Sequence, residues 1–543
     1  MSDCAAPPDI VRPLPTGGLR WLWPTVVTLG IALVVVARMA PLGRPFHNDS
    51  GAFIGMGKLW IDGGTPYVDL WDTKLPGVVL MGGVLYKLLG SAWWAYLALQ
   101  ATLAVAAAAI LAATARTLTV DASPLDRRRV GRATFAAGLV LLNQPRLLGD
   151  GFQLETPQLF FASVAAWLLA KGMRAEPRPI LGPRALLFIA AGVVAGIGAL
   201  SKPTGLSVVG AGAFVLLLQG TRRRRLSPMR DIAAICLGVL LVVAAIVAWT
   251  FQTGIAETMP YTLREISLYG SATPWSQIVS GKTALLVALT LAPAVAAFWA
   301  APKHHAPGKQ SVLRIGGWFT AAWILLELVG IVVQKRGYAY HFLPLGAPTT
   351  LAVGLAFLST PSRGRRWRSW ATLGPLALIV LAGIGPLLRD WRASLTLPSE
   401  LQSIRYLKDH TDPDDALFGD NVGRLSVMTD RPVGGRLVQM VQLVNHDEAP
   451  RRYMDQLLSD LKQRRPAFMI LRAPWKLEGE IARWEEQPVL AENPRRRIEY
   501  REAWERYLEW VDLRYERVAE LDALELLRRR DDWPAEEEPA AVR

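Results

Sequence analysis

Cysteine and histidine are scarce in this chain, and so is charge within its long apolar tracts. Of its 543 residues, two are cysteines, Cys4 and Cys236, and six are histidines. Cys236 lies inside an apolar tract and Cys4 near the N-terminus, so we expect neither a disulfide framework nor a cysteine-based metal site. Charges are almost absent from the long apolar tracts, and Glu327 is the clearest exception. A chain of this kind does not read as a disulfide-stapled or zinc-finger protein.

The charge that is present has a particular distribution. The formal net charge is +14, which by itself would suit a nucleic-acid partner. However, arginine clusters such as Arg222–Arg225 stand between apolar tracts, where basic residues fix the orientation of membrane segments. No nucleic-acid-binding module is present in the sequence. We therefore expect the lipid bilayer as a partner and no nucleic acid.

Long apolar tracts recur from Trp21 to about Leu388. Each has the roughly 20 residues that a helix needs to cross a bilayer, and soluble helices rarely stay apolar on every face for five turns. The sequence predicts an α-helical polytopic membrane protein with about eleven spans. They cover residues 21–40, 91–115, 133–145, 158–171, 185–201, 204–220, 231–251, 281–301, 315–333, 342–360 and 371–388. Residues 77–90 are shorter and favour an interfacial or re-entrant helix.

Basic residues predict how these spans are oriented. One set of alternating loops holds 21 lysines and arginines and the other holds 8. The positive-inside rule assigns the richer set to the cytoplasm. We expect a multi-pass protein of the inner (plasma) membrane with residues 1–20 as a cytoplasmic tail, and the first apolar tract as a retained span. The loop 41–76 and the C-terminal region are then external.

The composition changes beyond about residue 390. We predict a transmembrane domain over residues 21–390 and a small extracytoplasmic α/β domain over 391–543. Residues 399–410 and 449–464 indicate helices, 415–420 and 466–474 indicate buried strands, and 515–531 indicates two strands or a strand and a helix. This region contains no glycine-rich phosphate loop, HExxH pair or Ser/His/Asp signature. It would face the acceptor, act as a lid, or only stabilise the membrane part.

The first external loop, 41–76, is unusually acidic. Asp49 follows the first span almost at once, and Asp72 and Lys74 lie just before Pro76. A lysine two residues from an aspartate suits an anionic group at the depth of the lipid head groups. Tyr67 supplies an aromatic ring at the same interface and is a further candidate for substrate binding.

These residues carry a resemblance to a known family. An Asp-x-Gly after the first span, then "GGTPYVDLWDTKLPG" (63–77) and "KLLGSAWW" (87–94), resemble the first external loop of GT-C membrane glycosyltransferases. The similarity is closest to family 39, with protein O-mannosyltransferases and lipid A aminoarabinose transferases. It covers about residues 20–175 and reappears at "LSKPTGL" (200–206) and "QKRGYAYHFLPLGAP" (334–348). It implies the GT-C fold and a sugar donor carried on a polyprenyl phosphate.

The resemblance also implies roles for single residues. Asp49 matches the acid expected to act as general base, and Lys74 matches a phosphate contact beside Asp72, from which a threonine separates it here. Relatives carry a further functional acid in the second external loop, where Asp150 and Glu155 lie.

The chemistry of such a transfer needs cations for the phosphate leaving group and a base for the acceptor hydroxyl. Lys202, Arg336 and His341 are external candidates for contact with the phosphate. We expect a hexosyl or pentosyl transferase that inverts the sugar carbon in the cell envelope.

Other functions stay open from the sequence. A transporter would need inverted repeats and ionisable residues near the membrane midplane, and no clear repeat is seen. A polysaccharide polymerase or ligase would use the same lipid carriers. No cofactor is indicated with certainty, and neither Mg nor Mn is excluded as a divalent cation because no ligand spacing decides it. The acceptor is a lipid, a glycan or a protein.

Overall fold

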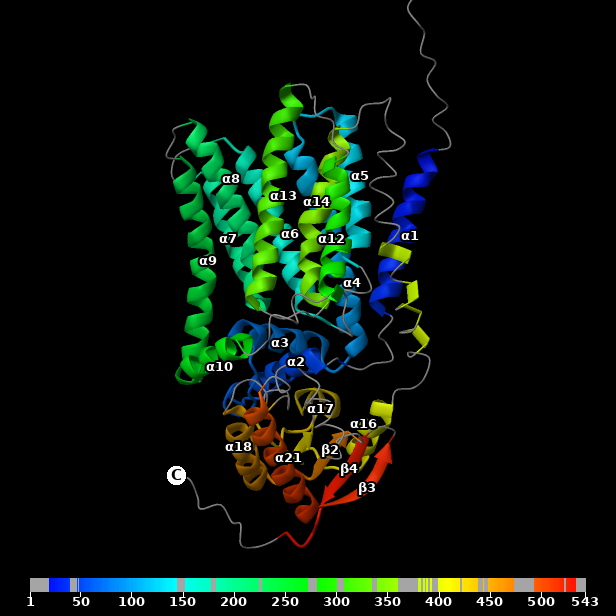
Figure 1. The fold of residues 1–543 in the computed structure, drawn as a ribbon, viewed down its shortest axis with the longest axis vertical. Helices are drawn as coiled ribbons and strands as arrows, with labels where there is room; N and C mark the ends of the chain where they lie inside the picture. Colours follow the sequence, from blue (N-terminus) through cyan, green and yellow to red (C-terminus); the bar gives the residue numbers. More distant parts are fainter. Residues whose placement is uncertain are drawn as a thin grey trace, which may run out of the picture.

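The computed structural model describes most of the chain. It covers residues 19–39, 46, 48–143, 152–176, 182–223, 227–271, 281–299, 307–334, 339–359, 379–381, 384–385, 387–388, 391–392, 399–419, 422–437, 443, 448–472, 493–521 and 524–533. Within these ranges the chain forms a bundle of long helices with a smaller group of helices and strands at one end (Figure 1). Asp150 and Arg336, two of the predicted site residues, lie outside the described residues.

The long helices lie side by side along the length of the molecule (Figure 1). They are α1 (Leu19–Met39), α4 (Trp93–Leu118), α5 (Pro124–Leu141), α6 (Glu155–Arg174), α7 (Pro183–Ser201), α8 (Ser207–Arg223), α9 (Ser227–Gln252), α12 (Gly281–Trp299), α13 (Pro307–Gln334) and α14 (Gly346–Ala356). The 3-10 turns η3 (Pro203–Leu206), η5 (Ala339–Leu345) and η6 (Phe357–Ser359) lie between or after them. Small residues bring the backbones together. A Cβ on Gly192 of α7 would lie 2.1 Å from the Ile235 carbonyl oxygen of α9.

The bundle confirms the predicted polytopic membrane fold. Five helical segments of the described residues are long and apolar enough to cross a bilayer: Trp93–Leu118, Pro183–Ser201, Pro203–Gly220, Pro228–Gln252 and Ile315–Gln334. Helices also overlap the other tracts predicted to span, except that 371–388 lies mostly outside the described residues. The count of eleven spans and the sidedness in the membrane remain predictions.

The first loop and the interfacial segment after it form two helices that lie across the end of the bundle (Figure 1). These are α2 (Asn48–Ile61), which sequence analysis did not predict, and α3 (Pro76–Leu89), which confirms a helix in the interfacial segment. Pro76 begins α3 in the position where a proline costs no hydrogen bond. Glycines let α2 and α3 touch, because a Cβ on Gly57 would lie 2.1 Å from the Gly83 nitrogen.

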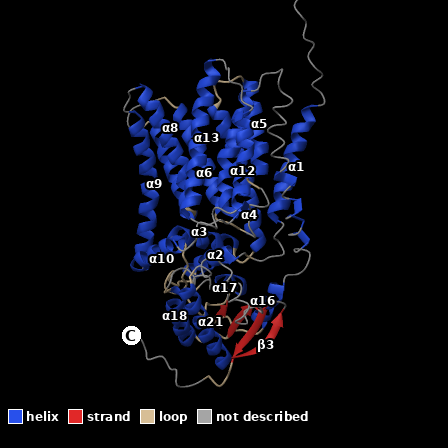
Figure 2. Ribbon diagram, viewed as in Figure 1, coloured by secondary structure: helices blue, strands red, loops and turns tan. Residues whose placement is uncertain are grey.

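The C-terminal elements combine helices with one small sheet (Figure 2). In chain order they are α16 (Ser399–Asp409), β1 (Leu417–Gly419), α17 (Val422–Thr429), α18 (Ala449–Arg464), β2 (Phe468–Arg472), α21 (Pro494–Arg514), β3 (Tyr515–Leu521) and β4 (Leu524–Arg529). The strand order is β1-β2-β4-β3, with β1 parallel to β2 and the other pairs antiparallel. The predicted strands and the α/β character are confirmed. The final segment is a strand hairpin, so the alternative of a strand and a helix is wrong.

One apolar core joins the first loop to the C-terminal elements. Met56 and Trp71 of the loop share it with Val422, Tyr453 and Trp504. The backbone also pairs across this boundary, since the Trp71 N–H donates to the Arg436 carbonyl at 2.6 Å. The loop is therefore packed between the bundle on one side and the C-terminal elements on the other.

Two further short segments complete this boundary. They are η4 (Ile255–Thr258) and α10 (Met259–Ser271), which follow α9. Tyr453 of α18 donates its hydroxyl to the buried carboxylate of Glu265 in α10, and Trp71 lies over Tyr453 with 5.2 Å between ring centroids. The bundle, the first loop and the C-terminal elements therefore meet in one aromatic cluster.

Candidate functional site

The first feature of the candidate site is an ion pair within the first loop. Asp49 stands in the first turn of α2 and Lys74 just before α3. The Lys74 ammonium donates to Asp49 Oδ1 at 3.2 Å, and the two side chains are 27% and 24% exposed. The sequence separation is 25 residues, and the turn between α2 and α3 closes it. Because both groups keep part of their surface open, they are accessible to a ligand.

The neighbours of Lys74 fix its position. The Tyr67 hydroxyl donates to the Lys74 carbonyl at 2.8 Å, and Tyr67 itself has a positive φ of 65°. Asp72 is buried and accepts from the Thr73 N–H at 2.6 Å. Burial, and then the charge of Asp72, hold the pKa of Tyr67 well above its usual value. In this structure the Tyr67 hydroxyl and one Asp72 oxygen therefore bind the loop backbone, and a direct role of either residue in substrate binding stays a prediction.

A second ion pair joins two helix ends. Glu155 is the first residue of α6 and is only 1% exposed, and it pairs with the Lys202 ammonium. Lys202 has an extended backbone because Pro203 follows it, so α7 stops there and the side chain leaves the helix. His341 Nε2 lies 4.0 Å from Glu155 Oε1. Three of the predicted site residues are thus brought together.

Tyr340 connects the two ion pairs. Its hydroxyl donates to Asp49 Oδ2 at 3.2 Å, while the Lys202 ammonium lies 5.4 Å from the centroid of its ring. Tyr340 belongs to η5, next to His341, whose ring lies edge-on to it at 4.7 Å. Tyr340 was not among the site residues predicted from the sequence, although the segment 334–348 that contains it carries part of the resemblance.

Arg38 is a second residue that sequence analysis missed. It lies at the end of α1, is 2% exposed and donates to Asn143 Oδ1 at 2.9 Å and to Thr156 Oγ1 at 3.0 Å. Thr156 also accepts from Gln100 at 3.0 Å and follows Glu155 in the chain. This network therefore fixes the start of α6, and with it the Glu155 carboxylate. A basic residue at the end of an apolar tract was the available signal.

The described residues do not supply an obvious metal centre. No group of three or more His, Cys, Asp or Glu side chains within the described ranges is placed to hold a metal ion. What these ranges offer is two carboxylates, two ammonium groups, a phenol and an imidazole at one end of a membrane bundle. Such a set can bind an anionic group and accept a proton.

Comparison with solved structures defines the class of fold. The chain superimposes on ArnT from Cupriavidus metallidurans, crystallised with undecaprenyl phosphate, at a TM-score of 0.57 and 14% identity. The match covers 96% of this chain and 99% of that one. The oligosaccharyltransferase of Archaeoglobus fulgidus in its apo form aligns with 87% of this chain and 72% of its own, at 11% identity and a TM-score of 0.49. No family model and no curated protein matches the sequence.

The ArnT match shows the fold directly. The chain has the GT-C fold of polytopic membrane glycosyltransferases, as the resemblance in the first external loop predicted.

Proposed function

We propose that this protein is an integral-membrane glycosyltransferase that moves a sugar from a polyprenyl-phosphate-linked donor to an acceptor. The observation that carries the proposal is the Asp49 carboxylate held between Lys74 and Tyr340. It is supported by the GT-C fold, and by ArnT, a protein of that fold crystallised with undecaprenyl phosphate. The site lies where the bundle meets the first loop, which suits a donor whose lipid stays in the bilayer.

The cations of the site suit the phosphate of such a donor. Lys74 is partly exposed beside Asp49, and Lys202 is placed by the break between α7 and η3. Polyprenyl phosphate leaves as an anion, so it needs positive charge near its oxygens more than a proton donor. His341 and Arg336 remain proposed contributors to the same binding.

Asp49 is the proposed general base. It removes the proton from the acceptor hydroxyl while the acceptor oxygen forms a bond to the sugar carbon. The bond from that carbon to the phosphate oxygen breaks, and its electron pair leaves with the polyprenyl phosphate. Direct attack inverts the sugar carbon. The sugar is a hexose or a pentose, and the acceptor is a lipid, a glycan or a protein.

The membrane placement belongs to the same proposal. The distribution of basic residues among the loops supports a cytoplasmic N-terminus and C-terminal elements outside the inner membrane. The acceptor would then reach the site from the external side. The transporter alternative calls for ionisable residues at broken helices near the midplane. Here Asp49 and Lys74 instead lie on the helices and turns of the first loop, which favours the transferase.

The proposal is tested by native mass spectrometry of protein extracted from its own membranes. Wild type is compared with Lys74→Ala, Asp49→Asn and the control Lys87→Ala, which changes an exposed lysine at the end of α3. We expect wild type, Asp49→Asn and the control to carry a polyprenyl phosphosugar, and Lys74→Ala to lose it. If all four carry only bulk phospholipid, even after polyprenyl phosphosugar is added, the proposed donor site is wrong.

A further inference from the structure

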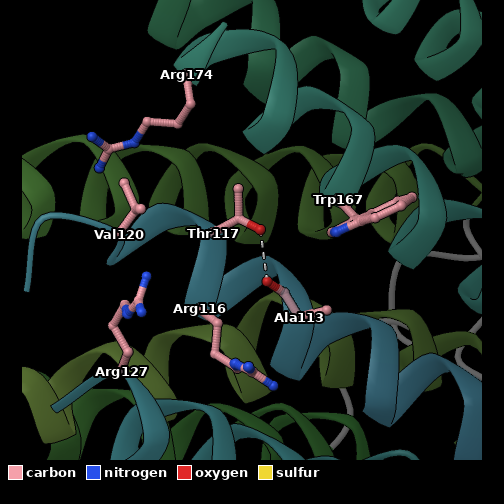
Figure 3. Close-up of a pocket in the computed structure, with 7 residues that line it drawn as sticks. All are labelled: Ala113, Arg116, Thr117, Val120, Arg127, Trp167 and Arg174. Carbon is pink, nitrogen blue, oxygen red and sulfur yellow. Dashed lines mark hydrogen bonds between the residues drawn. The ribbon is translucent and has the colours of Figure 1, made fainter. Parts of the chain in front are cut away.

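A cleft lies at the end of the bundle opposite the C-terminal elements. It is open to the surface, has a volume of about 460 Å³ and lies between α4, α5 and α6 (Figure 3). Three of its lining side chains are the arginines Arg116, Arg127 and Arg174, and none is acidic. Ala113 and Val120 supply an apolar part of the wall. The cleft is therefore cationic and partly apolar, and it is separate from the site that contains Asp49.

Two of these arginines are held in place by the fold. Arg174 pairs with Asp121 and donates to the Leu118 carbonyl at 2.5 Å. The stem of Arg116 crosses α5 at Gly131, where a Cβ would lie 2.7 Å from Arg116 Cδ. The Arg174 head group is therefore held near the cleft without a ligand, and the stem of Arg116 is packed against α5.

Arg127 lies at a position where the electrostatic potential of its own helix disfavours a positive charge. It lies in the first turn of α5, where the helix dipole disfavours a cation. Among the described residues, neither Arg116 nor Arg127 forms an ion pair, and Arg174 shares its charge with Asp121. The cleft therefore has an excess of positive charge that an anion would neutralise.

We propose that this cleft binds the phosphate of an anionic phospholipid head group. Guanidinium groups match phosphate oxygens in two-point hydrogen bonds, and basic pockets between membrane helices are known to suit such head groups. Trp167 lines the cleft beside Lys171, whose ammonium lies 3.9 Å from the indole centroid, and this aromatic fits the depth of the lipid backbone.

A soluble phosphate would make the same contacts with the arginines as the phosphate of a lipid head group. The position of the cleft at the end of membrane-spanning helices favours the lipid. The inference does not depend on the proposed glycosyl transfer, because it uses none of the same residues.

The test uses the full chain in detergent, stripped of lipid and then reloaded. Native mass spectrometry follows the binding of dioleoylphosphatidylglycerol, of zwitterionic dioleoylphosphatidylethanolamine and of inorganic phosphate. The test variant is Arg116→Gln/Arg127→Gln. The matched control is Arg128→Gln/Arg129→Gln, which removes the same charge from exposed positions on α5 that do not line the cleft. Thermal unfolding in detergent checks that both variants fold.

We expect wild type and the control to bind one phosphatidylglycerol at least tenfold more tightly than the test variant does. Phosphatidylethanolamine should bind weakly to all three proteins. Equal losses in the test variant and the control would overturn the proposal, since they would show a general effect of charge. If inorganic phosphate displaces the lipid at an equal concentration, the lipid assignment is also overturned and the cleft belongs to a soluble phosphate.

Discussion

The Tyr340 hydroxyl donates a hydrogen bond of 3.2 Å to Asp49 Oδ2 across a sequence separation of 291 residues. The same carboxylate accepts from Lys74 through its other oxygen. A turn near the end of the bundle therefore orients an acid that belongs to the first loop. The Asp49 carboxylate, the Lys74 ammonium and the Tyr340 hydroxyl form one hydrogen-bonded unit. We expect the loss of Asp49 to reduce the rate of sugar transfer more than the loss of the Tyr340 hydroxyl does.

Asp49→Asn keeps the size of the side chain and removes the proposed base. We expect the rate of sugar transfer to fall by about 10²–10⁴-fold, since that is what one positioned base contributes. The rate is measured as release of free polyprenyl phosphate from its phosphosugar in membranes that contain the natural acceptor. Glu257→Gln, which changes an exposed carboxylate of η4 outside the site, is the control. Unchanged release by Asp49→Asn would rule out the assigned base.

Tyr340→Phe removes only the hydroxyl and leaves the ring beneath Lys202. Because a hydrogen bond to a charged group contributes about 1.5–3 kcal/mol, we expect a loss of about ten- to a hundredfold in kcat/KM. Tyr340→Ala also removes the ring and should lose more. The prediction fails if Tyr340→Phe keeps the wild-type kcat/KM, because the ring alone would then explain any loss in Tyr340→Ala.

The acid–lysine element of the site could be predicted because it is local. Asp49 and Lys74 lie in one loop, and the structure pairs them. The contact of Tyr340 with Asp49 could not be predicted, because nothing in a single sequence reports a pairing over such a separation. Glu155 and Lys202 were proposed one by one, and only the fold shows that they form a pair.

The elements show a similar division. Apolar patterns predicted the long helices of the bundle and the strands β1 and β2, and they left a pair of strands open where β3 and β4 lie. It missed α2 because Gly51, Gly55 and Gly57 lower its helix propensity. Those glycines have a packing purpose that only the structure reveals, since α2 lies against α3 and α17. The short helix α17 was missed because eight residues carry little periodic signal.

Lys202→Met should destabilise the protein by more than the change in side-chain volume would suggest. It leaves the Glu155 carboxylate buried without its cation, and breaking such a pair costs about 3–5 kcal/mol. Glu155→Gln combined with Lys202→Met should recover part of that loss. Unfolding in detergent is measured for both single variants and the double variant. Additive effects would show that the pair contributes no coupling to stability.

Gly55→Ala should loosen the contact between the first loop and the C-terminal elements. The new Cβ would lie 2.5 Å from the Gly423 carbonyl oxygen of α17, and backbone cannot move aside as a flexible side chain can. We expect a loss of about 1–3 kcal/mol and faster proteolysis of the C-terminal elements. The control is Gly385→Ala, whose Cβ would meet nothing within 4 Å. Equal proteolysis of the two variants would contradict the packing argument.

The buried Lys58 ammonium predicts how this boundary responds to pH. It donates a hydrogen bond of 2.5 Å to Asp62 and lies 3.0 Å from Asp430, the residue directly after α17. Burial alone would lower the pKa of Lys58, but the hydrogen bonds that its ammonium donates to the two carboxylates outweigh burial and raise the pKa above 10.5. The hydrogen bond from Lys58 holds the pKa of Asp430 below 3.8.

The signs of these two shifts define a window of stability. A raised lysine pKa adds stability that is complete below pH 10.5 and is lost as the pH rises through the folded value. A lowered aspartate pKa adds stability that is complete above pH 3.8 and is lost as the pH falls through the folded value. The difference in Tm between wild type and Lys58→Met should therefore be constant from roughly pH 5 to 9 and shrink at both extremes. Lys87→Met, an exposed lysine of α3, should show no such window. A Lys58→Met difference that stays constant however far the pH falls below 3.8 would mean that the ion pair with Asp430 does not stabilise the boundary.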